Sequence, residues 1–533
     1  MELDSAAGQS RSKASRGRIV MLVDNGVRND SRVQKTARSA AEAGWEVILF
    51  GISPTSEIET WNIGAAEVRL VPKPGPLARR RQDRKGLRYR SPLAYRSTQV
   101  AEYRQQQVKA WRADLKFRAD AAKAQTQGPG RPSASGSPAR LIVPKAGAKA
   151  MSKWVSMRAR TTRRARKNRT NFDAPLDKAL TGFWQMTMGE RSWRRLLPYL
   201  YDYELAFGKH IDELEPDLIH AHDFRMLGVG ARAAVRARAA GRPVKLVWDA
   251  HEFVPGLHSQ HERWLPGHVA WEKEHSVFSD AVITVSPTLA ELLVKTHKLQ
   301  ETPYVVLNAP VTSPDPEEAA AADPTPDLRE LCGVGKDTPL LAYCGGINPV
   351  RGVETMIEGL LHLPDVHVAL VSTPPGRPFP ATAKIVQLVE ELGVGDRVHV
   401  LPFVPHWQVP EFLSTADAAV SPLHHLPNHE LALSNKFFEY SQAKLPLVTS
   451  DIRTMAEMVE KTGQGEVFKA QDVEDYVRAV KAVLADPQRY RTAYDDPGLL
   501  EQWTWEAQAV VLDEIYSRLL PGTEAPATSK AKG

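Results

Sequence analysis

Short, fully apolar runs alternate with longer amphipathic segments through most of the chain. Near the amino end, residues 18–24 are almost wholly apolar, a polar loop follows at 25–29, and residues 31–43 have helical spacing. Gly44 closes that helix and residues 45–50 begin the next apolar run. Strands that are apolar along their whole length are buried on both faces. Their alternation with helices of about 10 to 15 residues indicates a parallel sheet covered by helices on each side.

This alternation occupies two separate stretches of the sequence. The amino-terminal stretch continues with strand-like runs at 217–221, 244–248, 281–285 and 304–307. The carboxyl-terminal stretch has runs at 340–344, 366–371, 398–401, 418–420 and 447–449, with helices expected from Gly352, Ala381 and Ser434. We therefore predict an α/β chain with two doubly wound, Rossmann-like domains in tandem. Ligands of such sheets bind beyond the carboxyl ends of the strands.

Composition marks the boundaries between these parts. A segment rich in Pro, Ala and acids predicts a linker, and apolar positions at helical spacing near the carboxyl end predict a helix packed on the body. The predicted organisation is a disordered tail at 1–17, an amino-terminal domain at 18–309 with an insert at 73–189, a linker at 310–326, a carboxyl-terminal domain at 327–500, a helix at 501–520 and a solvated tail at 521–533.

The formal net charge of +6 hides a strong separation. Residues 79–169 hold 26 Lys and Arg against 4 Asp and Glu, a net +22, so the rest of the chain carries −16. Within this insert, residues 98–124 predict a charged helix, and the remainder, including a Gly/Pro/Ser-rich stretch at 127–138, is expected to be flexible. Such a segment can bind an anionic membrane surface or nucleic acid, or it can be a solvated linker without a partner. No nucleic-acid module is recognisable, so we favour the lipid surface.

The overall composition, 42% apolar and 25% charged, is that of a globular protein and excludes a fully disordered chain. Cys332 and Cys344 are too few for a disulfide framework and lack the spacing of a zinc site. No apolar run approaches the roughly 20 residues of a membrane span, and the first residues lack a signal-peptide core. We expect a cytoplasmic protein, with peripheral attachment to the inner face of the plasma membrane through the insert.

One strand end has the chemistry of a diphosphate site. Gly345 and Gly346 follow the run at 340–344, and Arg351 and Gly352 come just before the next predicted helix. Glycines let the backbone approach a ligand closely, and an arginine offers forked donors to phosphate. The pattern is neither a Walker loop nor Gly-x-Gly-x-x-Gly. The alternative is a tight strand-to-helix corner with a solvated charge.

A second candidate lies at the start of a predicted helix. Ser434 or Asn435 can cap it, which places Lys436 and Glu439 on one face of its first turns. A carboxylate there can accept hydrogen bonds from the vicinal hydroxyls of a ribose. The alternative is a surface Lys–Glu pair.

These segments, together with residues 399–404, 413–418 and 445–450, resemble the nucleotide-sugar-binding half of family 4 glycosyltransferases, the retaining group with a GT-B fold. In the amino-terminal half, residues 30–33, 217–222, 248–252 and 280–286 are similar to the same family. The similarity covers about residues 18–72 and 190–520. It implies transfer of a sugar from a nucleotide-diphosphate donor to an acceptor hydroxyl, with roles in cell-envelope or glycoconjugate biosynthesis.

The resemblance also implies roles for individual residues. Glu439 matches the ribose-binding glutamate of a paired motif whose first glutamate would fall at Leu431, next to Glu430. Arg351 matches a basic residue on the diphosphate, and Gly346 stands where the family often has another, which makes Lys436 the candidate second cation. His251 corresponds to a histidine beside the transferred sugar. The implied donor-binding set is Gly345, Gly346, Arg351, Phe403, Val404, Glu430, Asn435, Lys436 and Glu439; His251, Arg351 and Lys436 are the catalytic candidates, and Asn25, Gly26 and Arg32 should face the acceptor.

Arginine and lysine can neutralise a diphosphate, so no metal or cofactor is expected. Two other readings stay open. A nucleotide-sugar epimerase can use the same architecture, and the basic insert would also suit a non-catalytic polyanion-binding or membrane-surface protein.

Overall fold

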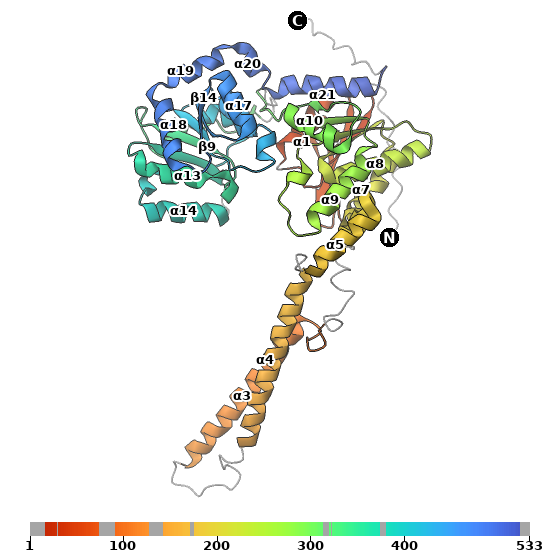
Figure 1. Ribbon diagram of the computed structural model, residues 1–533, viewed down its shortest axis with the longest axis vertical. Coiled ribbons are helices and arrows are strands. Elements are labelled where there is room, and N and C mark those ends of the chain that lie inside the picture. Colours follow the sequence, from red (N-terminus) through yellow and green to blue (C-terminus); the bar gives the residue numbers. More distant parts are fainter. Residues whose placement is uncertain are drawn as a thin grey trace. The chain divides into compact units, whose positions relative to one another are not determined.

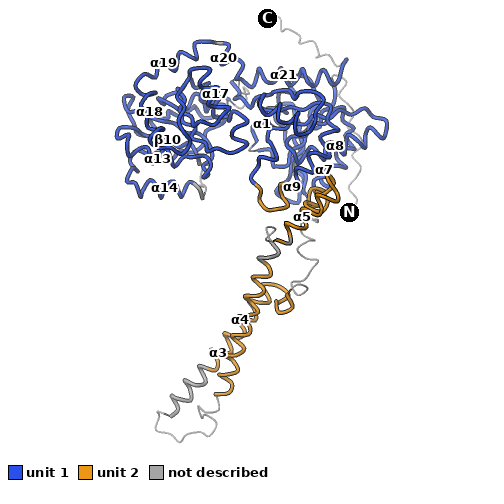
Figure 2. The backbone as a smooth tube through the Cα atoms, in the orientation of Figure 1, with its two compact units in different colours: residues 1–74, 203–258, 268–533 blue, residues 75–202, 259–267 orange. Residues whose placement is uncertain are grey.

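The computed structural model describes residues 16–28, 30–73, 91–126, 142–170, 175–312, 319–320, 322–373 and 380–522. It forms two compact units (Figure 2): the first comprises residues 1–74, 203–258 and 268–533, and the second residues 75–202 and 259–267. The predicted insert at 73–189 falls almost wholly in the second unit. The predictions for residues 1–15, 127–138 and 523–533 lie outside the described residues.

The first unit contains two lobes, each built on a doubly wound sheet. The sheet of the amino-terminal lobe has the strand order β3-β4-β2-β1-β5-β6-β7-β8. Its strands are β1 (Arg18–Leu22), β2 (Glu46–Ser53), β3 (Glu59–Ile63), β4 (Ala66–Pro72), β5 (Leu218–His222), β6 (Lys245–Asp249), β7 (Ala281–Thr284) and β8 (Tyr304–Val305). All neighbouring strands pair in parallel except β3 and β4, which are antiparallel. The predicted parallel strands are confirmed.

Helices cover both faces of this sheet. They are α1 (Ser31–Glu42), α7 (Tyr201–Leu214), α8 (Asp223–Ala239), α9 (Trp264–Ser276) and α10 (Pro287–His297). Side-chain caps set where two of them begin: the Asp30 carboxylate accepts from the Val33 amide, and the Ser286 hydroxyl accepts from the Leu289 amide.

The carboxyl-terminal lobe has a fully parallel sheet of order β11-β10-β9-β12-β13-β14. Its strands are β9 (Leu340–Cys344), β10 (His367–Thr373), β11 (Val398–Pro402), β12 (Ala418–Ser421), β13 (Leu447–Ser450) and β14 (Gly465–Phe468). Its helices are α12 (Leu328–Cys332), α13 (Val353–Gly359), α14 (Pro380–Leu392), α15 (Val409–Leu413), α16 (Asn435–Gln442), α17 (Arg453–Thr462), α18 (Val473–Ala485), α19 (Pro487–Arg491) and α20 (Pro497–Glu501). Alternate residues of β9 enter separate apolar clusters: Ala342 packs with α16, and Tyr343 packs with α13 and α18. The central strand is therefore buried on both faces.

The last helix, α21 (Trp505–Leu519), returns to the amino-terminal lobe (Figure 1). Leu512, Ile515 and Tyr516 are buried in the same apolar cluster as Ile19 of β1. Asp513 pairs with Arg16 at 2.8 Å. The predicted carboxyl-terminal helix is confirmed, and its partner is the lobe that is most distant from it in sequence.

The second unit is mainly helical. It contains α3 (Thr98–Thr126), α4 (Ile142–Thr170), α5 (Pro175–Met188) and α6 (Trp193–Leu196). Helices α3 and α4 lie side by side (Figure 1). No helix in the described parts of the chain has both the length and the apolar character needed to cross a bilayer.

The charged helix predicted at 98–124 is present, but the expectation that the remainder of the insert is flexible is wrong for α4 and α5. Helix α4 is ordered because it packs against α3. Its buried residues Ala148, Val155 and Thr162 recur every seven positions, as do Ala101, Val108 and Leu115 of α3. A seven-residue repeat of small or apolar residues joins two helices along one seam. In sequence this repeat is hidden among the cations.

Candidate functional site

The paired glycines stand at the carboxyl end of the central strand β9. Gly345 has φ +136°, and a Cβ placed there would lie 2.5 Å from Cε and 2.6 Å from Nζ of Lys436. A Cβ on Gly346 would meet nothing within 4 Å. The absence of a side chain at Gly345 thus lets the Lys436 amine lie directly against the strand end. The structure brings these two predicted residues together.

Two cations converge at this strand end. Lys436, in the first turn of α16, is 8% exposed. Burial and, next, the nearby Arg351 guanidinium lower the pKa of Lys436 to about 8. Among the described residues, neither Lys436 nor Arg351 forms an ion pair with a carboxylate. Two cations that form no ion pair, beside bare backbone, have the chemistry of an anion-binding site, and the Glu439 carboxyl is the acid that acts on Lys436.

Glu439 lies one turn after Lys436 on α16. Burial raises the pKa of the Glu439 carboxyl, and the positive charges of Lys436 and of Lys35 on α1 oppose that rise. At the start of the same helix, the Ser434 hydroxyl oxygen is buried without a hydrogen-bond partner. The helix therefore presents a cation and a carboxyl on one face near the end of β9, as the sequence pattern predicts, whereas Ser434 occupies the N-cap position without a side-chain cap hydrogen bond.

Glu430, the second candidate carboxylate, is engaged elsewhere. It accepts from His425 Nδ1 at 2.6 Å and from the Arg453 amide at 2.8 Å, and His425 also contacts Asp451 at 3.0 Å. The hydrogen bond to Glu430 raises the pKa of His425. These contacts fix the loop before α16 to the start of α17, and a donor role for Glu430 stays a prediction.

The other donor-side candidates lie around the same sheet edge. Phe403 and Val404 follow β11, and Val404 packs against the apolar cluster that contains Phe437 of α16. Asn435 is exposed at the first position of α16. The roles of Phe403 and Asn435 in binding the donor stay predictions.

The carboxyl edge of the amino-terminal sheet gathers polar side chains from three adjacent strands. Asp24 follows β1, Asp223 follows β5, and His251 and Glu252 follow β6. Asp24 pairs with Arg225 at 2.6 Å. Burial raises the pKa of Asp223 to about 7, and the charges of Glu252 and Asp24 add to the rise while His251 opposes it.

Asp223 is a residue that the sequence reasoning missed. Its φ of +66° is rare for a non-glycine residue, and its carboxylate accepts from the Phe224 amide at 2.6 Å. Strained backbone of this kind clusters at functional sites. The sequence did contain a signal, since Asp223 directly follows a buried strand.

Arg32 lies behind this edge rather than on the acceptor side, where we expected it. Its guanidinium donates to both Asp249 carboxylate oxygens at 2.8 Å and to the Val306 carbonyl at 3.0 Å. Although burial acts to raise it, the pKa of Asp249 stays well below its usual range because of Arg32, His220 and His222. Arg32 is buried because a guanidinium facing the sheet from α1 is needed to compensate the Asp249 charge.

His220, His222 and Asp249 form a buried group with the spacing of metal ligands. The Arg32 guanidinium already covers both carboxylate oxygens, and His220 Nδ1 contacts the Tyr516 hydroxyl at 2.6 Å. We interpret the group as an ion-pair network. His251 Nδ1, 4.0 Å from Asp249 Oδ1, is buried without a hydrogen-bond partner.

The loop after β1 holds the other acceptor-side candidates. Asn25 is exposed, but its side chain accepts from the Val27 amide and donates to Asp30, each at 2.8 Å. Gly26 has open space on its Cβ side, with the Ile52 carbonyl oxygen at 3.8 Å. Hydrogen bonds within the loop thus fix its conformation. Its role in binding the sugar acceptor stays a prediction.

The two lobes are hydrogen-bonded to each other through the loops that carry these residues. Asn428 accepts from the Phe253 amide at 2.8 Å and donates to the Phe253 carbonyl at 3.2 Å. The Ser286 hydroxyl donates to the Leu431 carbonyl. The loop bearing His251 is therefore joined to the loop bearing Glu430.

We expect Asp223→Asn to raise thermal stability above pH 7 and to flatten its pH dependence. A raised folded-state pKa means that the carboxyl stabilises the fold below about pH 4 and loses this contribution as pH rises through about 7. Asparagine stays neutral, tolerates positive φ and can keep the bond to Phe224. The gain at pH 8 should be about 1 to 2 kcal/mol, read as melting temperature from pH 4 to 9. Asp365→Asn, which removes an exposed carboxyl of the other lobe, is the control; an unchanged pH profile in Asp223→Asn would contradict this.

Comparisons with known proteins agree with the two-lobe organisation of the chain. Residues 327–496 match the family described as Glycosyl transferases group 1, and residues 170–312 match Glycosyltransferase Family 4. A D-inositol 3-phosphate glycosyltransferase of Xylanimonas cellulosilytica is 25% identical over 259 residues, 47% of this chain and 60% of that protein. A glycogen synthase of Mycobacterium tuberculosis is 27% identical over 327 residues, 58% of this chain and 71% of that protein. The chain thus spans less than two thirds of the first of these relatives.

Solved structures show the same fold at low sequence identity. Sucrose-phosphate synthase from Thermosynechococcus elongatus superposes with a TM-score of 0.58 at 15% identity, over 95% of this chain and 99% of that one. The α,α-trehalose 6-phosphate synthase of Burkholderia multivorans gives 0.51 at 12% identity over the same shares. The paired parallel sheets and the two consecutive family matches show that the chain belongs to the GT-B glycosyltransferases of the group 1, family 4 type.

Proposed function

We propose that this protein is a retaining glycosyltransferase that moves a sugar from a nucleotide-diphosphate donor to an acceptor hydroxyl. The observation that carries the proposal is the pair of cations Arg351 and Lys436, neither of them in an ion pair among the described residues, beside the bare backbone of Gly345 at the end of β9. A diphosphate has the charge and size to occupy this place. Glu439, one turn further along α16, is then positioned to accept hydrogen bonds from the ribose hydroxyls.

The chemistry follows from where charge develops. When the bond from the sugar to the diphosphate breaks, negative charge grows on the leaving phosphate oxygen. Arg351 and Lys436 stabilise that charge, and donors fixed in advance act most strongly where water is excluded. Because two cations neutralise the diphosphate, the proposed reaction needs no metal ion, and chelation with EDTA should leave the rate unchanged.

The acceptor is expected at the carboxyl edge of the amino-terminal sheet. There His251 and Asp223 lie together, and a neutral carboxyl at Asp223 can both donate to and accept from a hydroxyl. The Nδ1 atom of His251 lies 4.0 Å from Asp249 Oδ1 and has no hydrogen-bond partner, so it is available to an acceptor hydroxyl.

We further propose a cytoplasmic enzyme of cell-envelope or glycoconjugate biosynthesis that is peripheral to the inner face of the plasma membrane. The net +22 of residues 79–169 supports the membrane location, since cations near an anionic lipid surface are attracted to it.

A thermal-shift screen with UDP, GDP, ADP and their sugar conjugates tests the donor site. A ligand that binds only the folded protein raises its melting temperature. We expect one nucleoside diphosphate to stabilise the protein. Glu439→Ala should lower the affinity for that nucleotide about tenfold, the effect of losing one charged hydrogen-bonding group. Glu474→Ala, an exposed change on α18, is the control. No stabilisation by any of these ligands would contradict the proposal.

Incubating the protein with its donor alone separates transfer from epimerisation. An epimerase converts the donor into a new sugar nucleotide, whereas a transferase gives at most slow hydrolysis. Formation of the epimer without acceptor would replace the proposed reaction.

Nucleotide affinity should fall as pH rises through about 8. Lys436 is charged below its pKa of about 8 and neutral above it, so the attraction to a diphosphate weakens between pH 7 and 9.5. Phosphate is fully ionised there because its second pKa is about 6, and Lys35, with a pKa of about 7, is largely neutral. Calorimetric titration should show this decline in the wild type. In Lys436→Met the nucleotide affinity should be low and independent of pH over the same range. Lys481→Met, on the exposed face of α18, should behave as the wild type.

A further inference from the structure

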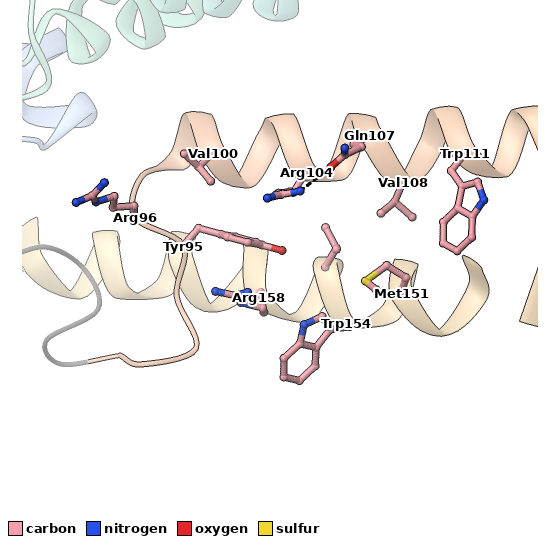
Figure 3. Close-up of a pocket in the computed structure, with 11 residues that line it drawn as sticks. Tyr95, Arg96, Val100, Arg104, Gln107, Val108, Trp111, Met151, Trp154 and Arg158 are labelled. Atoms are coloured by element: carbon pink, nitrogen blue, oxygen red, sulfur yellow. Dashed lines mark hydrogen bonds between the residues drawn. The ribbon is translucent and has the colours of Figure 1, made fainter. Parts of the chain in front are cut away.

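Helices α3 and α4 of the second unit enclose an open groove of about 1020 Å³ (Figure 3). Nothing in the proposed transfer reaction uses it. Its lining changes character along its length: Arg96 lies at one end, and Trp111 and Met151 lie at the other.

The first end is cationic. Arg96, Arg104 and Arg158 line it together with Tyr95. Arg158 donates to the Leu93 carbonyl at 2.9 Å and lies over the Tyr95 ring at 4.1 Å, and Arg104 donates to the Gln107 side chain at 2.8 Å. All three contacts are with neutral groups. No carboxylate lines the groove as far as the structure describes it, so the positive charge is uncompensated.

The other end is apolar and open. Trp111, Met151 and Trp154 line it and are 40%, 45% and 47% exposed. The α3–α4 seam is closed by the small residues of the seven-residue repeat, so these large side chains are not needed to hold the helices together. Exposed Trp and Met among cations are typical of helices that lie in a membrane interface.

The charge of the surrounding surface points the same way. Helix α4 carries ten Lys and Arg and no Asp or Glu. The acids Glu102 and Asp114 of α3 are not among the residues that line the groove. A single-stranded nucleic acid would match the charge and can stack bases on the tryptophans, whereas an acyl chain matches the aliphatic lining of Met151, Val108 and Val155 as well.

We propose that the α3–α4 groove binds an anionic phospholipid of a bilayer surface, with the phosphate at Arg96, Arg104 and Arg158 and the acyl chain along Trp111 and Met151. The proposal gives a specific site to the membrane location put forward with the proposed function, and it does not depend on transfer activity.

Co-sedimentation of the full chain with vesicles tests this. Wild type should bind vesicles of phosphatidylcholine with 30% phosphatidylglycerol, a composition of roughly one anionic lipid in three, and should not bind phosphatidylcholine alone. Arg96→Gln with Arg104→Gln should weaken binding about tenfold or more. The matched control, Arg163→Gln with Arg164→Gln, removes the same charge from exposed positions of α4 outside the groove and should have a clearly smaller effect.

Brominated lipid provides a second measurement. Its quenching of tryptophan fluorescence should decrease in Trp111→Phe with Trp154→Phe, since those rings would contact acyl chains. Circular dichroism checks that the variants stay helical. If both double arginine variants lost vesicle binding equally, or if quenching stayed unchanged, the groove would not be the lipid site. Binding would then be a diffuse attraction between the basic surface and the anionic lipids. Tighter binding to a single-stranded oligonucleotide than to vesicles would replace the lipid with nucleic acid.

The same variants, examined by nucleotide thermal shift, separate the two proposals. Groove variants should keep the wild-type response to the nucleoside diphosphate. If no nucleotide stabilises any of the proteins while vesicle binding follows the groove, the transferase proposal fails and the lipid site stands.

Discussion

Arg351→Ala should lower the turnover number by about 10² to 10³-fold, the loss measured when one fixed donor to a developing anion is removed. Arg351 and Lys436 are the cations at the end of β9, and Lys436 alone is partly neutral at its pKa of about 8. Arginine therefore supplies the charge that persists across the working pH range. Initial rates at saturating donor, once the donor is known, measure the effect.

A matched variant tests whether the lower turnover of Arg351→Ala comes from a damaged fold. Arg489→Ala removes an exposed arginine of α19 in the same lobe and should keep the wild-type rate. Circular dichroism and melting temperature of Arg351→Ala should match the wild type, because the side chain pairs with no carboxylate among the described residues. A full rate in Arg351→Ala would show that the diphosphate binds elsewhere.

Gly345→Ala should both destabilise the carboxyl-terminal lobe and weaken nucleotide binding. The new Cβ would lie 2.5 Å from Lys436 Cε, so the amine has to leave the strand end. A φ of +136° also disfavours alanine, at a cost of about 1 to 3 kcal/mol. We expect a lower melting temperature together with a nucleotide affinity reduced about as far as in Lys436→Met, measured by calorimetry.

The neighbouring glycine is the natural control. Gly346→Ala places its Cβ in open space, and Gly346 has no positive φ, so the free energy of unfolding should change by less than about 0.5 kcal/mol. Equal effects at Gly345 and Gly346 would show that the lysine does not depend on the bare backbone.

The strands and the two-lobe architecture could be predicted from sequence because parallel strands buried on both faces leave continuous apolar runs. The runs at 18–24 and 340–344 became β1 and β9, the central strands of their halves. The pairing of β3 with β4 and the α3–α4 hairpin could not be predicted in this way. Their partners are amphipathic or highly charged, and a single buried residue in seven gives almost no periodic signal beside ten cations.

The candidate site was only partly predictable. Gly345, Lys436 and Arg351 could be found because a glycine pair after a strand and a lysine at a helix start each have local chemical meaning. Whether a charged side chain is free or already paired depends on distant segments. Arg32 is taken by Asp249, 217 positions away, and Glu430 by Arg453 and His425. The one sequence signal for Asp223 is its place directly after a buried strand, because its positive φ and its raised pKa arise only in the folded structure.

The return of α21 to β1 affects how the chain can fold during synthesis. Trp505, Leu512, Ile515 and Tyr516 complete the apolar cluster under β1, and Arg16, which also donates to the Ala43 carbonyl, pairs with Asp513 and donates to Ser517 of that helix. While the ribosome is still adding residues, the amino-terminal lobe has an unfilled face, whereas the carboxyl-terminal lobe already contains its whole sheet. The half of the protein that is made first is therefore the half that is finished last.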